Sequence, residues 1–167
     1  MRNREAHERA MTNAASYLPE DSDGGRDPSH LVPELSRRAR GIPTWAVMRA
    51  LGREGIADMV GRHCRLARDL AARLAAEPGI MILNDVVLNQ IICRFGGDHG
   101  AAEGDALTEA TIQRIQQEGR CFAGGARWRG QWAMRLSVAN YATDDSDIAE
   151  AAEAIIDAWR AVQSTQG

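Results

Sequence analysis

The clearest pattern along the chain is an alternation of bulky apolar residues with small or polar ones between residues 131 and 141. A period of two is typical of a β-strand, because successive side chains of a strand point to opposite faces. The bulky set is Trp132, Met134, Leu136 and Val138, and the set between them is Ala133, Arg135, Ser137 and Ala139. The pattern therefore predicts a strand with one buried face, and it places Arg135 alone among small neighbours on the other face.

Three further stretches are typical of strands: residues 80–83, 86–95 and 121–128. Asn84-Asp85 is the expected turn between the first two of them. A second turn near Arg129-Gly130 precedes the alternating strand, so we expect residues 121–128 to form a hairpin with it. The pair Gly124-Gly125 inside a strand suggests a bulge or the close approach of another backbone.

Helical patterns fill most of the remaining chain. Residues 5–15 have helix-forming composition, and a short helix is expected from about Pro43 to Gly52, where glycines permit a break before a longer helix that runs to about residue 76. Its apolar stripe includes His63, which we interpret as a half-buried packing residue. Thr108 is the expected cap of a helix over residues 109–118. Residues 143–147 are the expected start of the last helix, with a capping hydroxyl and with acids in the first turn.

This order of elements predicts an α+β fold of two layers. We expect a mainly antiparallel sheet of about four strands with helices on one face, preceded by long connecting helices. The expected divisions are residues 1–41, an N-terminal helix with a mobile loop; residues 42–76, the connecting helices; and residues 77–167, a small α+β domain.

Composition narrows the classes of partner. The 167 residues carry a net charge of −3, and the basic residues form no dense patch, which argues against nucleic acid as the main partner. No run of 18 apolar residues exists and the start of the chain is charged, so we expect neither a membrane span nor a signal peptide, and a cytoplasmic location. The widely spaced Cys64, Cys93 and Cys121 fit reduced thiols and indicate no metal site.

All 20 basic residues are Arg, and the chain contains no Lys. It therefore cannot supply a Schiff-base lysine or the lysine of a Walker-type phosphate site.

Arg135 is the strongest candidate for binding chemistry. The fork of donors on a guanidinium matches a carboxylate with two parallel hydrogen bonds, and its small neighbours leave room for a planar anion. The alternative is an ordinary arginine on the solvated face of an antiparallel sheet.

Several residue runs together resemble the group II pyridoxal-phosphate-dependent amino acid decarboxylases, which act on aromatic amino acids, glutamate and 2,4-diaminobutyrate. The runs are residues 15–19 (Ala-Ser-Tyr-Leu-Pro), 33–41 (Pro-Glu-Leu-Ser-Arg-Arg-Ala-Arg-Gly), Trp45 with 49–52 (Arg-Ala-Leu-Gly), 83–90 (Leu-Asn-Asp-Val-Val-Leu-Asn-Gln) and 134–138 (Met-Arg-Leu-Ser-Val). The resemblance covers nearly the whole chain but only the last third of a family member, and it implies the small C-terminal domain of the type I fold.

The resemblance implies roles for three residues. Arg135 would bind the carboxylate of an amino acid substrate. Tyr17, in a loop that closes on the substrate in the family, would be the catalytic acid that protonates the carbanion. Ser36 would approach the phosphate of the cofactor, pyridoxal 5'-phosphate, in the neighbouring subunit of a homodimer, although Arg37, Arg38 and Arg40 in the same segment could simply pair with Glu34 and nearby acids.

The lysine, stacking histidine and pyridine-facing aspartate of the family have no counterpart in this chain. We therefore expect a C-terminal portion of a decarboxylase that is inactive in isolation. One alternative is a stand-alone, non-catalytic dimerisation or interaction module derived from such an enzyme. Another is a small-molecule-binding α+β domain that uses Arg135 for any acid. The sequence does not identify the amino acid.

Overall fold

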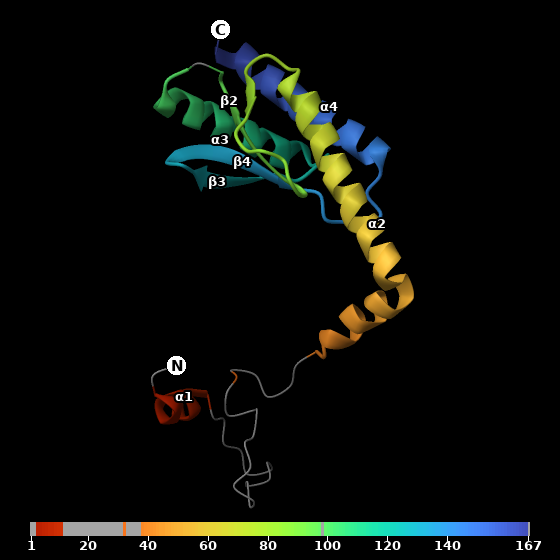
Figure 1. Cartoon of the computed structure of the whole chain (residues 1–167). Coiled ribbons are helices and arrows are strands. Elements are labelled where there is room, and N and C mark those ends of the chain that lie inside the picture. Colours follow the sequence, from red (N-terminus) through yellow and green to blue (C-terminus); the bar gives the residue numbers. More distant parts are fainter. Residues whose placement is uncertain (1–2, 12–31, 33–37, 98, 167) are drawn as a thin grey trace, which may run out of the picture. The chain divides into compact units, whose positions relative to one another are not determined.

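The structure is a computed structural model that describes residues 3–11, 32, 38–97 and 99–166 (Figure 1). The chain divides into two compact units, Met1–Ala50 and Leu51–Gly167. Among the described residues no helix combines the length and the apolar character needed to cross a membrane.

The first unit contains helix α1, Arg4–Met11, and the beginning of helix α2, Gly41–Ala75. Asn3 caps α1, because its side-chain oxygen accepts a hydrogen bond from the backbone N–H of Ala6 at 3.0 Å. No residue of α1 is buried. Of the predicted helix over residues 5–15, the last four residues lie outside the described part of the chain.

Helix α2 breaks at Gly52, whose φ of 62° and ψ of −170° are not helical. A positive φ is accessible to glycine without steric cost, so the predicted break at this glycine is confirmed. The longer part of α2 after the break lies in the second unit.

The second unit is built on a four-stranded antiparallel sheet in the order β1-β2-β4-β3. Its strands are β1 (Ile80–Ile82), β2 (Gln90–Phe95), β3 (Gly124–Trp128) and β4 (Gln131–Ser137), and its helices are α3 (Ala101–Glu118) and α4 (Asp145–Gln166). Figure 1 shows α3 and α4 on the same side of the sheet. The predicted α+β class is confirmed.

The core lies between one face of the sheet and the helices. β2 contributes Ile91, Cys93 and Phe95, and β4 contributes Met134 and Leu136, which the strand register places on the same face. The helices contribute Leu66, Leu70 and Leu74 of α2, Leu107, Ile112 and Ile115 of α3, and Ile148, Ile155 and Trp159 of α4. The buried ring of Trp159 lies 5.5 Å from that of Phe95, and its indole N–H donates to the carbonyl of Pro78 at 2.9 Å.

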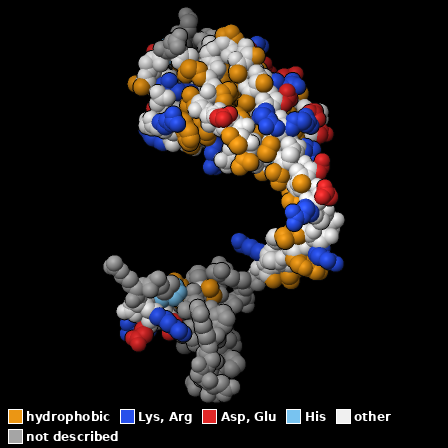
Figure 2. All heavy atoms as spheres, viewed as in Figure 1, with side chains coloured by type: hydrophobic (Ala, Val, Ile, Leu, Met, Phe, Trp, Pro, Cys, Tyr) orange, Lys and Arg blue, Asp and Glu red, His pale blue; other side chains and the backbone are white. Residues whose placement is uncertain are grey.

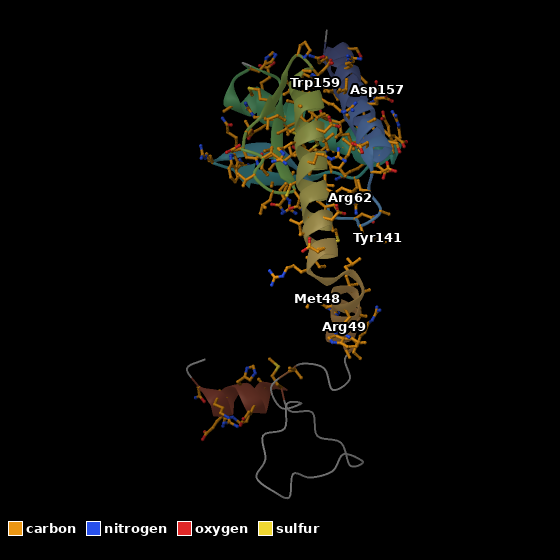
Figure 3. The ribbon with its side chains drawn as sticks, turned by 45° about the vertical axis from the view of Figure 1, so that its right-hand side comes forward. Met48, Arg49, Arg62, Tyr141, Asp157 and Trp159 are labelled. Atoms are coloured by element: carbon orange, nitrogen blue, oxygen red, sulfur yellow. The ribbon has the colours of Figure 1, made fainter. Side chains whose placement is uncertain are left out.

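Polar contacts from three residues of α2 reach the loop between β4 and α4 and the first residue of α4. Arg62 donates to the carbonyls of Tyr141 and Thr143, both at 2.7 Å (Figure 3). His63 is 7% exposed and lies 3.0 Å from the carbonyl of Asn140, which agrees with its predicted packing role. Arg65 forms two hydrogen bonds with the carboxylate of Asp145.

Several predicted boundaries were wrong. α3 begins at Ala101 and not at residue 109, so Thr108 lies within the helix, where its hydroxyl donates to the carbonyl of Gly104 and accepts the N–H of Phe95. Residues 86–89 form no strand, and β2 begins only at Gln90. The side chain of Asn84 accepts the backbone N–H of Ile92 and donates to the carbonyl of Gln90.

The predicted cap of the last helix was also wrong. The carboxylate of Asp144, rather than a hydroxyl, accepts the backbone N–H groups of Ser146 and Asp147. The Asp147 carboxylate accepts the N–H of Asp144 in return, so two acids form a reciprocal capping arrangement. Residues 121–123 precede β3 without belonging to it, and β4 ends at Ser137.

Candidate functional site

Arg135 lies on β4 with its side chain on the face of the sheet opposite the core. Both of its strand neighbours in the core, Met134 and Leu136, are buried, whereas Arg135 is exposed. The register pairs Arg135 with Ile92 of β2 on one side and with Gly124 of β3 on the other. The alternation predicted from the sequence is therefore confirmed for this strand.

The guanidinium of Arg135 makes no hydrogen bond or ion pair with any residue in the described part of the chain. A methyl group built on Gly124 would meet nothing within 4 Å, so the space beside Arg135 on the β3 side is open. Ala133 and Ser137 flank it along β4. A guanidinium whose N–H groups have no partner and face open space can bind a carboxylate with two parallel hydrogen bonds.

Gly125, the other half of the glycine pair, serves the fold. A Cβ at Gly125 would collide with the ring of Trp132, which therefore packs over the glycine backbone. Arg127 lies over the same ring, 5.9 Å from its centroid. The pairing of β3 with β4 continues residue by residue through both glycines, so the close approach at this position comes from an indole ring and not from a bulge.

A second arginine, Arg94 of β2, is buried and has partners. It is 3% exposed and donates from Nη2 to the carbonyl of Ala101 at 2.7 Å, and Asp105 lies 3.5 Å from the same nitrogen. A Cβ at Gly104 would collide with this guanidinium, so α3 carries a glycine where Arg94 packs against it. The carboxylate of Asp105 also accepts a hydrogen bond from the backbone N–H of Trp132 at 2.9 Å. This cluster therefore joins the start of α3 to the start of β4.

Other candidate chemistry in the described residues is sparse. Burial raises the pKa of the Cys93 thiol to about 12 and also raises the pKa of the Cys121 thiol. Both thiols are consequently protonated at neutral pH and are poor nucleophiles. No three His, Cys, Asp or Glu side chains within residues 3–11, 32, 38–97 and 99–166 are grouped to hold a metal ion.

The other two predicted site residues, Tyr17 and Ser36, lie outside the described residues. The sequence did not single out Arg94, and it singled out Gly124 only as half of a glycine pair and not as the neighbour of Arg135. Counting back from the turn at Arg129-Gly130 pairs residue 128 with 131 and residue 124 with 135, so the place of Gly124 beside Arg135 was available from the sequence. The signal for Arg94 was a charged residue within an apolar strand, between Cys93 and Phe95.

Comparisons with known proteins agree on one family. The family model of the pyridoxal-dependent decarboxylase conserved domain matches residues 1–95. Aromatic-L-amino-acid decarboxylase from Sus scrofa is 26% identical over 125 residues, and the match covers 73% of this chain and 24% of that protein. Histidine decarboxylase from Drosophila melanogaster is 26% identical over 133 residues, covering 79% of this chain and 15% of that protein.

A solved structure shows the same fold. The structure of Catharanthus roseus tryptophan decarboxylase in complex with L-tryptophan superposes with a TM-score of 0.69 at 15% identity, covering 93% of this chain and 33% of that one. The chain thus spans about a quarter of the length of the pig relative and a third of the plant enzyme. Since the family description covers more than half of the chain, this protein belongs to the pyridoxal-dependent decarboxylase family.

Proposed function

We propose that this chain supplies the part of a pyridoxal-phosphate-dependent amino acid decarboxylase that binds the substrate carboxylate, and that Arg135 is the binding residue. The observation that carries the proposal is an arginine with free donors beside an open space on the sheet, in a chain that belongs to this family. Exposure alone also fits an ordinary surface arginine, and family membership favours the binding role.

Arg135 is well placed for such a role because it stands on the second strand from the edge of a paired sheet. Hydrogen bonds on both sides of β4 fix the backbone at Arg135, so the side chain starts from a defined position. Two charge-assisted hydrogen bonds to a carboxylate each contribute about 1.5–3 kcal/mol. Together they would both hold and orient the amino acid.

Pyridoxal phosphate is the cofactor of the family, but the residues of this chain do not suit its covalent attachment. The chain contains no Lys, so no side chain can form an imine with the aldehyde. We therefore assign no chemical step to the cofactor on this chain, and we expect no decarboxylation by the chain alone.

Two further parts of the proposal concern residues whose placement the structure does not describe. Tyr17 is proposed as the acid that protonates the substrate carbon, and Ser36 as a contact to the cofactor phosphate across a homodimer. Both assignments rest on the resemblance of their sequence runs to the family.

The test begins with the DNA that precedes the codon for Met1, where a reading frame containing a His-Lys pair would supply the missing amine. Its product and this chain, produced together, should release carbon dioxide from an amino acid. Arg135→Met should then raise KM by at least about 100-fold, because two charge-assisted hydrogen bonds of about 1.5–3 kcal/mol each are lost. Arg68→Met, at an exposed arginine of α2, is the matched control and should leave KM unchanged.

Equal kinetics for the Arg135→Met and Arg68→Met variants would overturn the role of Arg135. An absorbance band of an internal imine when pyridoxal phosphate is added to this chain alone would contradict the expected inactivity.

A second candidate function is a non-catalytic interaction module. The observation in its favour is a set of large apolar side chains on the first part of α2: Ile42 is 64%, Trp45 63% and Met48 53% exposed. Figures 2 and 3 show hydrophobic side chains on this helix, with Met48 beside Arg49. Clustered exposed apolar residues mark interaction surfaces. The second function would be favoured if this chain forms a stable assembly and the genome that encodes it contains no gene for a decarboxylase part that carries the lysine.

A further inference from the structure

The second unit contains a cavity of about 280 Å³. It lies between the segment that precedes β3 and the segment that connects β4 to α4. Its walls come from the end of β4, the segment before β3, the start of α4 and one residue of α2. The lining residues include Leu70, Phe122, Ser137, Ile148, Glu150 and Ile155. Arg135 does not line the cavity, so this is a separate feature from the candidate carboxylate site.

One wall of the cavity is an unpaired strand edge. Val138 exchanges hydrogen bonds with Asn89, on the β2 side, so the backbone groups of its neighbours Ser137 and Ala139 point to the other side. β3 begins at Gly124, opposite Arg135, and the residue that would pair with Ser137 is Phe122. Phe122 belongs to no strand, so the inner edge of β4 lacks a partner strand at Ser137.

The segment before β3 is hydrogen-bonded to α3, and none of residues 121–123 is hydrogen-bonded to Ser137 or Ala139. Gly119 ends α3 in the left-handed conformation, and the side chain of Gln116 donates to the carbonyl of Ala123 at 2.7 Å. Ala123 itself is 1% exposed. The gap beside Ser137 is therefore fixed by the structure on both sides, and Phe122 stands 81% exposed at its mouth.

The walls of the gap have a definite chemistry. The floor is apolar, formed by the buried Leu70, Ile148 and Ile155. The rim carries Asp147 and Glu150, neither of which forms an ion pair with a described residue. The rim cation Arg120 is already paired with Asp157 at 3.1 Å, so the free charge of the rim is negative.

We propose that this gap binds an extended segment of a partner polypeptide, which adds to β4 beside Ser137 and Ala139. Backbone hydrogen bonds to an exposed strand edge give affinity in such complexes, and pockets for alternate side chains give specificity. An apolar residue of the segment enters the floor, and a Lys or Arg two positions away lies beside Glu150. The added strand pairs with β4 at the ordinary interstrand spacing of about 4.8 Å.

Hydrogen exchange of the isolated chain tests the edge directly. The N–H of Val138 donates to Asn89 and should exchange slowly, whereas the N–H groups of Ser137 and Ala139 should exchange rapidly. Equal protection of Ser137 and Val138 in the free chain would overturn the proposal.

Peptide titration tests the occupant. The probe is acetyl-Gly-Val-Thr-Arg-Gly-amide, followed by ¹H–¹⁵N spectra of the full chain. It should slow the exchange of the Ser137 amide and shift residues that line the gap. The same peptide with Glu in place of Arg, or with an N-methyl group on Thr, should bind more weakly. Equal binding of all three peptides, or shifts confined to other surfaces, would overturn the proposal.

Two protein variants complete the test. Glu150→Gln removes the rim charge and should weaken binding of the Arg peptide about twofold to fivefold, the size of one exposed ion pair. Glu109→Gln makes the same change on the exposed surface of α3 and should have no effect. Ala151→Leu fills the gap and should abolish binding; the Glu150→Gln result decides the matter if the Leu variant does not fold. Equal affinity for wild type and Glu150→Gln would contradict the predicted position of the basic residue.

Discussion

Gly124 lies directly opposite Arg135 in the β3–β4 hairpin, and the space into which a side chain at residue 124 would extend is empty. The backbone of Gly124 is not in the left-handed region, so the conformation does not require glycine there. Glycine also weakens a strand. The fold thus gains nothing from glycine at this position, whereas the carboxylate proposed to bind Arg135 would gain room to approach the guanidinium.

Stability measurements on the two glycines separate these roles. Gly125→Ala should lower the free energy of unfolding by about 1–3 kcal/mol, because the added methyl group overlaps the Trp132 ring. Gly124→Ala should change it by no more than about 0.5 kcal/mol in either direction. Urea denaturation of both variants checks the prediction, and equal effects at the two positions would contradict it.

A larger side chain at residue 124 should affect ligand binding instead of folding. In the decarboxylase assembly proposed above, Gly124→Val should raise KM for the amino acid by about 10-fold, because the branched side chain occupies the space beside Arg135. Retention of the wild-type melting temperature is the required control. An unchanged KM in a folded Gly124→Val variant would show that the substrate approaches Arg135 from another side.

The sequence predicted the features that depend on local pattern. The alternation around Arg135, the hairpin turn at Arg129-Gly130 and the break at Gly52 each follow from a few neighbouring residues, and the structure confirms them. Arg129 and Gly130 both adopt positive φ, as a tight turn between antiparallel strands requires.

The features that the sequence did not predict depend on contacts between distant residues. The helix expected over residues 109–118 already begins at Ala101, beside the contact in which Arg94 of β2 packs against Gly104. Residues 86–89 resembled part of a strand, but β2 begins only at Gln90, where the side chain of Asn84 bonds to the backbone of Gln90 and Ile92. Neither contact leaves a periodic signal in the sequence.

Gly104 provides a test in which helix propensity and packing predict opposite results. Within a helix, Gly→Ala ordinarily stabilises by about 1 kcal/mol. Here Gly104→Ala should destabilise by about 1–3 kcal/mol, because the methyl group collides with the buried Arg94 guanidinium. A double-mutant cycle with Arg94→Met should show non-additive effects. Additive effects, or stabilisation by Gly104→Ala alone, would show that Arg94 moves aside freely.

The start of α4 should make stability depend on acid pH. The pKa of Asp144 lies below its ordinary value of 3.8, because its carboxylate accepts hydrogen bonds from the Ser146 hydroxyl and from the backbone N–H groups of Asp147 and Ser146. The pKa of Asp145 is also lowered, because its carboxylate accepts hydrogen bonds from Arg65. A carboxylate with a lowered pKa stabilises the folded state above its unfolded-state pKa, and this stabilisation is lost as pH falls through the folded-state pKa. The free energy of unfolding should therefore fall below about pH 4.

Variants at these positions assign the acid dependence. Asp144→Asn should reduce the loss of stability below about pH 4 while keeping a capping side chain at the same position. Asp58→Asn is the control, since Asp58 is an exposed acid of α2. Urea denaturation at several pH values provides the measurement. Identical pH profiles for wild type and Asp144→Asn would show that other carboxylates determine the acid dependence.

The thiol of Cys93 should report on the opening of the core beneath the strands β2 and β4. Cys93 is fully buried on β2 opposite Met134, and burial raises its pKa to about 12, so the native thiol should resist a disulfide reagent at pH 8. Cys121 is only half-buried and should react sooner, although burial also raises its pKa. Mass spectrometry after timed labelling distinguishes the two. Cys93 lies in the core between the sheet and the helices, so the reagent reaches it only when this core opens, and its labelling rate should rise with urea in step with global unfolding. Labelling of Cys93 as fast as that of Cys121 in the native chain would mean that the core beneath β2 and β4 opens locally.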